Sequence, residues 1–256
     1  MNGSKIVLLA GKGITTNILY NALNEEFNIE KIILEESVSK KEFLKKRIKR
    51  LGIRKVSGQV MFQLSIVKVL NFFSGKRKME ILQEYSLKDA PLPEDKIISV
   101  LSVNDEECIS ILQKINPAIV VIIGTRIISQ KTLSCIPAKF VNIHAGITPK
   151  YRNVHGAYWA LVNNDPENCG VTVHLVDSGI DTGSIIYQQP IKITGKDNFV
   201  TYPFLQLGEG IIYLKKALRN ILEENLVLKN GVSESKIWHH PTFLEYLYYR
   251  IVHNKK

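Results

Sequence analysis

Hydrophobic and polar positions form two kinds of pattern that alternate along most of this chain. Short apolar runs, typical of buried strands, cover residues 5–10, 29–34, 97–101, 118–123, 140–143, 171–176 and 185–191. Segments with apolar residues three or four positions apart, typical of amphipathic helices, cover residues 105–115, 155–163 and 202–222. Because strands that alternate with helices usually pair in parallel, the pattern predicts an α/β fold with a doubly wound, mostly parallel sheet.

Residues 38–85 interrupt this alternation with a helical insertion. Its first part, 40–55, is basic and has apolar residues at helical spacing, and its second part, 60–73, is mostly apolar. A basic amphipathic helix followed by an apolar one is typical of a segment that docks on a membrane surface or on a partner. The pattern fits equally two helices packed on the sheet with their lysines in water, so the sequence leaves both interpretations open.

Composition and charge narrow the class of protein. The 256 residues carry a formal net charge of +10, and residues 40–55 hold nine basic side chains against one acid. The remainder is nearly neutral, which argues against a protein that is basic all over for binding nucleic acid. No apolar stretch reaches the roughly 20 residues that a membrane-spanning helix needs. The three isolated cysteines disfavour a disulfide framework and a zinc site, and they favour a reducing cytoplasm.

Candidate chemistry is concentrated between residues 140 and 183. Asn142 and His144 lie two positions apart on one predicted strand, so their side chains project from the same side. Asp181 follows the next apolar run, in a turn flanked by glycines. Open α/β sheets bind ligands at the carboxyl ends of their strands. An amide, an imidazole and a carboxylate at that edge therefore form a candidate site for acyl chemistry.

The spacing of these residues resembles the signature of the folate-dependent formyltransferases, the family of glycinamide ribonucleotide, methionyl-tRNA and sugar-amine formyltransferases. The resemblance covers Asn142-x-His144, His174 seven residues before Asp181, and the loop 124–129, in which Ile128 precedes Asn142 by fourteen residues. It implies a Rossmann-like formyltransferase fold and transfer of a formyl group from 10-formyltetrahydrofolate to a primary amine. It also implies catalytic roles for Asn142, His144 and Asp181, without a metal.

The resemblance further implies two sets of binding residues. Those predicted to contact the folate are Arg126, Ile127, Ile128, Val176 and Ser178. Those predicted to contact the amine substrate are Gly11, Gly13, Lys150, Tyr151 and Arg152. The two glycines follow the first strand, where backbone N–H groups at a helix start can approach a phosphate, although a tight turn without a ligand explains them equally well.

The identity of the amine is predicted by elimination within the family. Residues 1–225 are predicted to form the catalytic domain, with the insertion at about 38–85, and residues 226–256 form an aromatic-rich tail without the second domain of the tRNA enzymes. This layout favours the amino group of a nucleotide-linked sugar used in surface polysaccharide synthesis. Methionyl-tRNA formyltransferase-like activity and formyltetrahydrofolate hydrolysis are the alternatives within the family.

A hypothesis of another class uses the insertion. The basic and apolar segment 40–73 could make the chain a membrane-surface binding protein with vestigial catalysis. The expected location is the cytoplasm, including the inner face of the membrane. The exposed insertion or the tail could also form a homodimer contact. The sequence does not decide whether the insertion folds over the site as a lid.

Overall fold

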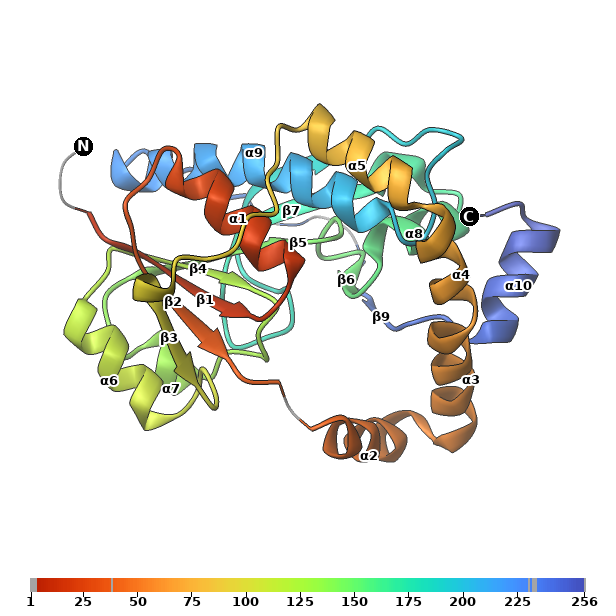
Figure 1. Ribbon diagram of the computed structural model, residues 1–256, viewed down its shortest axis with the longest axis horizontal. Helices are drawn as coiled ribbons and strands as arrows, with labels where there is room; N and C mark the ends of the chain where they lie inside the picture. Colours follow the sequence, from red (N-terminus) through yellow and green to blue (C-terminus); the bar gives the residue numbers. More distant parts are fainter. Residues whose placement is uncertain (1–3, 38, 230, 232–233, 256) are drawn as a thin grey trace.

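The chain folds around a seven-stranded sheet in the order β3-β2-β1-β4-β5-β7-β8 (Figure 1). The computed structural model describes residues 4–37, 39–229, 231 and 234–255, and the strand count refers to these. The strands are β1 (Ile6–Gly11), β2 (Ile29–Glu35), β3 (Ile97–Val100), β4 (Ile119–Ile123), β5 (Lys139–His144), β7 (Gly170–Leu175) and β8 (Ile185–Pro190). The first five strands in this order, β3, β2, β1, β4 and β5, pair in parallel with their neighbours. Strand β7 pairs antiparallel with both β5 and β8. The prediction of a doubly wound, mostly parallel sheet is confirmed.

Helices cover both faces of the sheet, because successive strand side chains point to opposite faces. Leu8 and Val121 belong to the core beneath one pair of helices, and Leu9 and Val120 belong to the core on the other face. The first pair is α1 (Ile14–Asn24) and α9 (Tyr202–Leu222), and the second is α6 (Glu106–Ile115) and α7 (Gln130–Leu133). The remaining helix of the sheet body is α8 (Gly156–Val162), and short 3₁₀ turns lie at Glu94–Lys96 and Pro166–Asn168.

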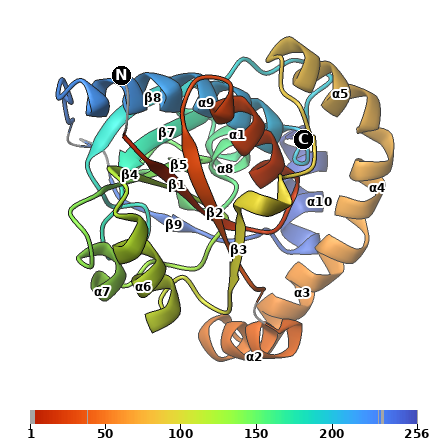
Figure 2. The same cartoon turned by 60° about the vertical axis from the view of Figure 1, so that its left-hand side comes forward.

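The insertion forms an arc of four consecutive helices along one side of the molecule (Figure 2). They are α2 (Lys40–Leu51), α3 (Ile53–Leu64), α4 (Ile66–Phe73) and α5 (Gly75–Glu84). A separate core joins this arc to the sheet body and to α10 (Phe243–Val252), and Phe62, Tyr158, Phe199 and Tyr246 form its centre. The predicted helical insertion is present, with four helices where the sequence pattern predicted two. The C-terminal tail holds it through α10, and the sheet body holds it through contacts such as Arg77 to Asp197.

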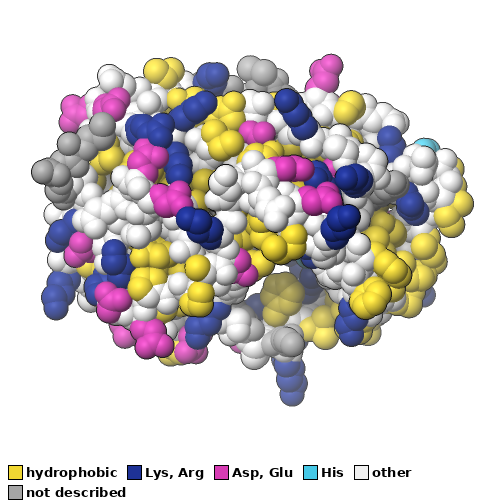
Figure 3. Space-filling view, turned by 45° about the horizontal axis from the view of Figure 1, so that its top comes forward, with side chains coloured by type: hydrophobic (Ala, Val, Ile, Leu, Met, Phe, Trp, Pro, Cys, Tyr) yellow, Lys and Arg dark blue, Asp and Glu magenta, His cyan; other side chains and the backbone are white. Residues whose placement is uncertain are grey.

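The arc leaves a large apolar surface in contact with solvent. Phe72 is 82% exposed and Phe73 is 77% exposed. Hydrophobic side chains gather along the right-hand edge of Figure 3, on the side where Figure 1 places α4 and α10. Residues Ile53–Phe73 are long and apolar enough to cross a membrane by length and composition, with 17% of that window buried. The sequence expectation that no stretch reaches this length was wrong, because Arg54, Lys55 and Lys68 interrupt the apolar run. Length and composition alone are weak evidence for a membrane span.

The tail also reaches the loop that follows β5. Strand β9 (Ile237–Trp238) pairs in parallel with β6 (Arg152–Asn153). The indole of Trp238 donates a hydrogen bond to the Lys150 carbonyl at 3.0 Å and stacks on the ring of Tyr151. The tail therefore places its residues beside the candidate site, which the sequence pattern did not predict. The domain boundary near residue 225 stays a prediction.

Candidate active site

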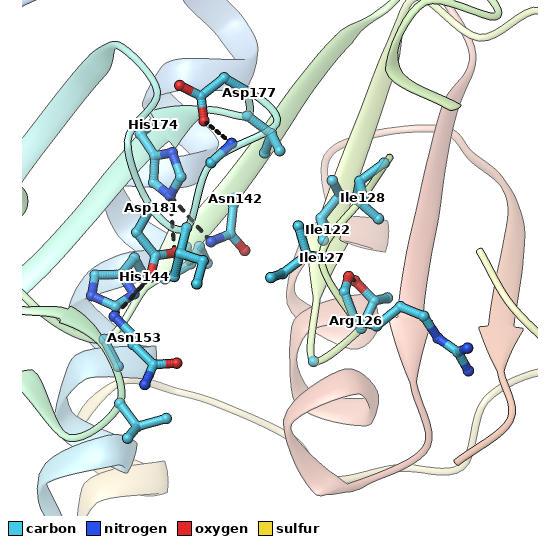
Figure 4. Close-up of a pocket in the computed structure, with 18 residues that line it drawn as sticks. Ile122, Arg126, Ile127, Ile128, Asn142, His144, Asn153, His174, Asp177 and Asp181 are labelled. Carbon is cyan, nitrogen blue, oxygen red and sulfur yellow. Dashed lines mark hydrogen bonds and ion pairs between the residues drawn. The ribbon is translucent and has the colours of Figure 1, made fainter. Parts of the chain in front are cut away.

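Strand β5 positions the centre of the site. Asn142 and His144 lie on it, and Asn142 pairs in register with His174 on the antiparallel strand β7. Residues directly opposite each other on neighbouring strands project from the same face of the sheet. The three side chains therefore converge at one end of β5, and the turn after β7 brings Asp181 to the same point (Figure 4).

Burial and hydrogen bonds define the protonation of His174. Its Nδ1 lies 2.7 Å from the Leu175 carbonyl oxygen, which only accepts, so Nδ1 carries the proton and Nε2 is an acceptor. The Asn142 Nδ2 group donates to that Nε2 at 3.2 Å. Burial lowers the pKa of His174. A neutral His174 thus fixes the orientation of the Asn142 amide, and one amide N–H of Asn142 remains for another acceptor.

His144 and Asp181 form the second half of the site. The Nε2 of His144 donates to the Tyr151 carbonyl oxygen at 2.7 Å, which turns Nδ1 towards Asp181, 3.3 Å from its Oδ2. The backbone N–H of Asn153 donates to the same Oδ2 at 2.8 Å. Asp181 has φ of 50° and Asn153 has φ of 82°, in the left-handed region that few residue types adopt easily. Backbone conformations of this kind are concentrated at functional sites.

A cavity of about 410 Å³ opens beside these four side chains. One wall carries Asn142, His144, His174 and Asp181, and the facing wall is apolar. Ile122, Ile127 and Ile128 form the apolar wall (Figure 4), and Val176 also lines the cavity. Ligand pockets commonly combine a mostly apolar lining with a few convergent polar groups, so this cavity is suited to a flat, partly apolar ligand whose reactive end faces Asp181.

The loop that forms the apolar wall is held by Glu35, a buried residue at the end of β2. The Glu35 carboxylate accepts from the Arg126 backbone N–H at 2.9 Å and from the Val103 N–H at 2.9 Å, and it pairs with the Arg126 guanidinium at 2.5 Å. The Arg126 side chain consequently points away from Asp181 (Figure 4). Sequence reasoning missed Glu35, although an acid that ends an apolar strand was the available signal.

The predicted folate residues lie around this cavity with one difference. Arg126, Ile127, Ile128 and Val176 line it, whereas Ser178 is exposed and lies outside the lining. Their role in binding folate stays a prediction. Asp177 and Gly179 line the cavity beside Ser178, so the turn after β7 contributes through its neighbours.

The predicted substrate residues lie outside the cavity lining. Lys150 pairs with Asp165 at 2.6 Å, and the buried Tyr151 donates its hydroxyl to the same carboxylate at 2.8 Å. Arg152 donates to the Ile180 carbonyl at 3.1 Å, which fastens the turn that carries Asp181. These three residues of the loop after β5 thus have structural partners at Asp165 and in the turn after β7, and their contact with substrate stays a prediction.

The two predicted glycines lie at the start of α1. A Cβ atom on Gly11 would lie 2.4 Å from the Gly124 carbonyl oxygen, so close packing of two backbones requires glycine there. Gly13 precedes the first turn of α1 as its N-cap residue without a side-chain cap. Neither glycine lines the cavity beside Asp181. Close packing of two backbones explains why residue 11 is glycine, and a phosphate contact at Gly11 or Gly13 stays a prediction.

Comparison with known proteins identifies the family of this chain. A family model described as formyl transferase matches residues 40–203. The methionyl-tRNA formyltransferase of Finegoldia magna is 36% identical over 98 residues, which are 38% of this chain and 31% of that protein. The methionyl-tRNA formyltransferase of Halothermothrix orenii is 32% identical over 142 residues, 55% of this chain and 44% of that protein. The matches therefore span less than half the length of these curated relatives.

Solved structures share the fold at low sequence identity. A sugar N-formyltransferase from a Shewanella species superposes with a TM-score of 0.57 at 14% identity, covering 91% of this chain and 76% of that one. Glycinamide ribonucleotide transformylase 1 from Symbiobacterium toebii superposes with a TM-score of 0.56 at 18% identity, covering 88% and 91%. Likeness at this identity supports the fold alone, and it confirms the predicted Rossmann-like formyltransferase architecture. Since the family model covers more than half of the residues, the chain belongs to the formyl transferase family.

Proposed function

We propose that this protein is a folate-dependent N-formyltransferase that transfers a formyl group from 10-formyltetrahydrofolate to a primary amine. The observation that carries the proposal is the convergence of Asn142, His144 and Asp181 at the polar wall of a cavity whose other wall is apolar. The apolar wall and the strand-end location suit the ring system of a folate. When bound, the folate supplies the formyl group.

The chain's own residues would act on charge and protons. The free N–H of Asn142 can donate to the oxygen on which negative charge develops when an amine attacks the formyl carbon. Such a donor is typically worth about 3–4 kcal/mol of transition-state stabilisation. Asp181 can accept the proton that the amine sheds and return it to the leaving folate nitrogen as the bond between that nitrogen and the formyl carbon breaks. A positioned base of this kind is typically worth about 10²–10⁴-fold in rate. The Nε2–H of His144 is committed to the Tyr151 carbonyl, so His144 would orient Asp181 only when Nδ1 also carries a proton, which it would then donate to Oδ2 of Asp181.

For the amine, we propose the amino group of a nucleotide-linked sugar. Support comes from the structural neighbours, which include the Shewanella sugar N-formyltransferase and a sugar 3N-formyl transferase solved in the presence of dTDP and 5-N-formyl-THF. The curated relatives described above act, by their names, on methionyl-tRNA, so that acceptor is the second candidate within the family.

The decisive experiment measures tetrahydrofolate release from 10-formyltetrahydrofolate by the purified protein. The reaction is run with a panel of amino-sugar nucleotides, with methionyl-tRNA and without any amine, and an Asn142→Ala variant is the control. Release that depends on one amine and falls at least 100-fold in the variant supports the transferase and identifies its acceptor. Release without any amine would instead indicate a hydrolase, and no folate turnover under any condition would refute the proposal.

A second function, attachment to an anionic membrane surface, is favoured by one specific observation. Phe72 and Phe73 are exposed on α4, in the same insertion as the basic helix α2, whose lysines complement anionic lipid headgroups. We propose that the protein lies in the cytoplasm, at the inner face of the membrane. Flotation with vesicles of phosphatidylglycerol tests the membrane attachment. Wild-type protein should float with the vesicles, and a Phe72→Ser/Phe73→Ser variant should float at least fivefold less. Equal recovery of both proteins, or no flotation of either, contradicts membrane attachment through α4.

A further inference from the structure

A second cavity, of about 620 Å³, adjoins the candidate active site. Helix α2, the loop after β4, the segment after β5 and the tail each form one side of it. Figure 3 shows a hollow at the lower middle, between the sheet body and the segment where Figure 1 places α2. The two cavities share the wall residues Thr125, Arg126, Ile127, Asn153 and Val154. A ligand in the second cavity therefore lies next to the reacting groups.

The charge of this cavity is positive and only partly neutralised. Lys46, Arg47, Arg50 and Arg126 line it, and its lining contains no Asp or Glu. Lys46 pairs with Glu42 on its own helix and Arg126 pairs with Glu35. Among the residues that the structure describes, no carboxylate lies within ion-pair distance of Arg47 or Arg50.

The other contacts of these two arginines do not supply negative charge. The Arg47 guanidinium lies 5.7 Å from the centre of the Phe43 ring, and Arg50 Nη2 lies 3.4 Å from Nδ1 of His239. The pKa of Arg47 is lowered, mainly by burial and secondly by the positive charge of the nearby Arg50. Two adjacent cations without a counter-ion repel each other, so an anion bound between them would be stabilised.

The tail residues that close the cavity are neutral imidazoles. His240 is held by Gln59, which donates to its carbonyl at 2.6 Å, and by His155, whose Nε2 lies 2.8 Å from its Nδ1. Burial and the Arg47 charge lower the pKa of His240 to about 4. Burial and the charge of Arg50 also lower the pKa of His239. These side chains offer hydrogen bonds to an anion without neutralising the arginines.

Asn153 connects this cavity to the reacting groups. Its backbone N–H donates to Asp181, while its side chain donates to the Trp238 carbonyl at 2.5 Å and lies 3.3 Å from Nδ1 of His239. One residue therefore contacts both the proposed proton acceptor and the wall of the cationic cavity. A ligand with phosphate at one end and an amine at the other could reach both places at once.

We infer that the cavity between α2 and the tail binds the diphosphate of the amine substrate, through Arg47 and Arg50. The inference rests on the proposed function for the amine end of the ligand, and on the unpaired arginines for the phosphate end. Arginine is suited to this role because its planar donors match phosphate oxygens in pairs. The diphosphate could belong to a nucleotide-linked or a lipid-linked amino sugar, which present the same chemistry at this point.

The test measures binding without turnover, so it stays informative even if formyl transfer fails. Titration calorimetry follows inorganic pyrophosphate, uridine diphosphate and farnesyl diphosphate binding to the full chain at constant ionic strength. An Arg47→Gln/Arg50→Gln variant is compared with Lys45→Gln/Lys49→Gln, which removes the same charge from exposed positions of the same helix outside the cavity lining. Thermal unfolding of both variants confirms that they are folded.

We expect pyrophosphate affinity to fall at least tenfold in the arginine variant and less than twofold in the lysine variant. Tighter binding of uridine diphosphate than of pyrophosphate identifies a nucleotide source, and tighter binding of farnesyl diphosphate identifies a lipid source. Equal losses in the two variants, or no pyrophosphate binding to the wild-type chain, overturn the inference. A parallel titration uses a folate that carries several glutamates. A loss of affinity confined to that folate in the arginine variant also overturns the inference, because the cavity would then serve the donor.

Discussion

Replacing Asp181 with asparagine should remove most of the activity while leaving the fold intact. The Asp181 carboxylate accepts the Asn153 N–H at 2.8 Å and faces His144 Nδ1 at 3.3 Å. An asparagine oxygen can keep the first contact, so we expect the free energy of unfolding to change by no more than about 1 kcal/mol. The amide cannot accept the proton of the attacking amine, and loss of a positioned base typically costs about 10²–10⁴-fold, or about 3–5 kcal/mol.

The assay compares kcat/KM for amine-dependent tetrahydrofolate release with the midpoint of thermal unfolding. Asp177→Asn is the matched control, because Asp177 lines the same cavity and belongs to the same turn. Its carboxylate accepts from the Gly179 N–H at 3.0 Å and from the Thr182 hydroxyl at 2.7 Å, so it serves the turn. We expect a loss below tenfold for the control. The reasoning is refuted if Asp181→Asn keeps more than a tenth of wild-type activity, or if both variants lose equal amounts.

Two further predictions follow from the packing of the site. A methyl group on Gly146 would lie 2.3 Å from the Tyr151 carbonyl oxygen, which accepts the proton of the His144 imidazole. Gly146→Ala should therefore lower the free energy of unfolding, measured in urea, by about 1–3 kcal/mol and should lower kcat. Unchanged stability and kcat would contradict this packing argument. Burial lowers the pKa of His155 to about 3 and of His240 to about 4. The unfolded chain therefore binds more protons below pH 6.5, and stability should fall as pH decreases from 7 to 5, by up to about 1.4 kcal/mol per pH unit for each histidine. Asparagine suits the left-handed backbone of residue 155, which has φ of 57°. In His155→Asn, the free energy of unfolding measured at each pH should therefore fall less steeply with decreasing pH. A slope as steep as that of the wild-type chain would contradict the lowered pKa of His155.

The strands of the sheet could be predicted from the sequence because the pattern of apolar residues that specifies each strand is local. The period-two alternation and the runs at residues 118–123 and 171–176 require only that strands be buried, and the structure places strands there. The same alternation predicted that the side chains of Asn142 and His144 project from the same side of one strand. Helix α9 begins at Tyr202 and ends at Leu222, as its apolar spacing predicts.

The partners of the site residues could not be predicted, because they depend on contacts between distant segments. The Asn142–His174 pair requires the register of two antiparallel strands, and nothing in either strand alone specifies it. Glu35 reaches the loop at Arg126 from a strand end 91 positions earlier. An isolated acid at the end of a strand has many possible partners in a sequence, and only the packed sheet selects one.

The insertion and the tail show why the acceptor was the hardest part to predict. Among their described residues, neither segment forms a hydrophobic core of its own, and Phe62 of the insertion is fully buried against Phe199 and Tyr246 of other segments. Once docked, α2 brings arginines and the tail brings histidines to the same cavity, 189 positions apart in the chain for Arg50 and His239. Selection among amines would then depend on α2 and the tail together with the wall residues that the two cavities share, while the reacting groups remain on β5 and the turn after β7. A change of acceptor made in α2 and the tail could leave the groups that move the proton in place, because Asn153 is the shared wall residue that donates to Asp181 and contacts His239.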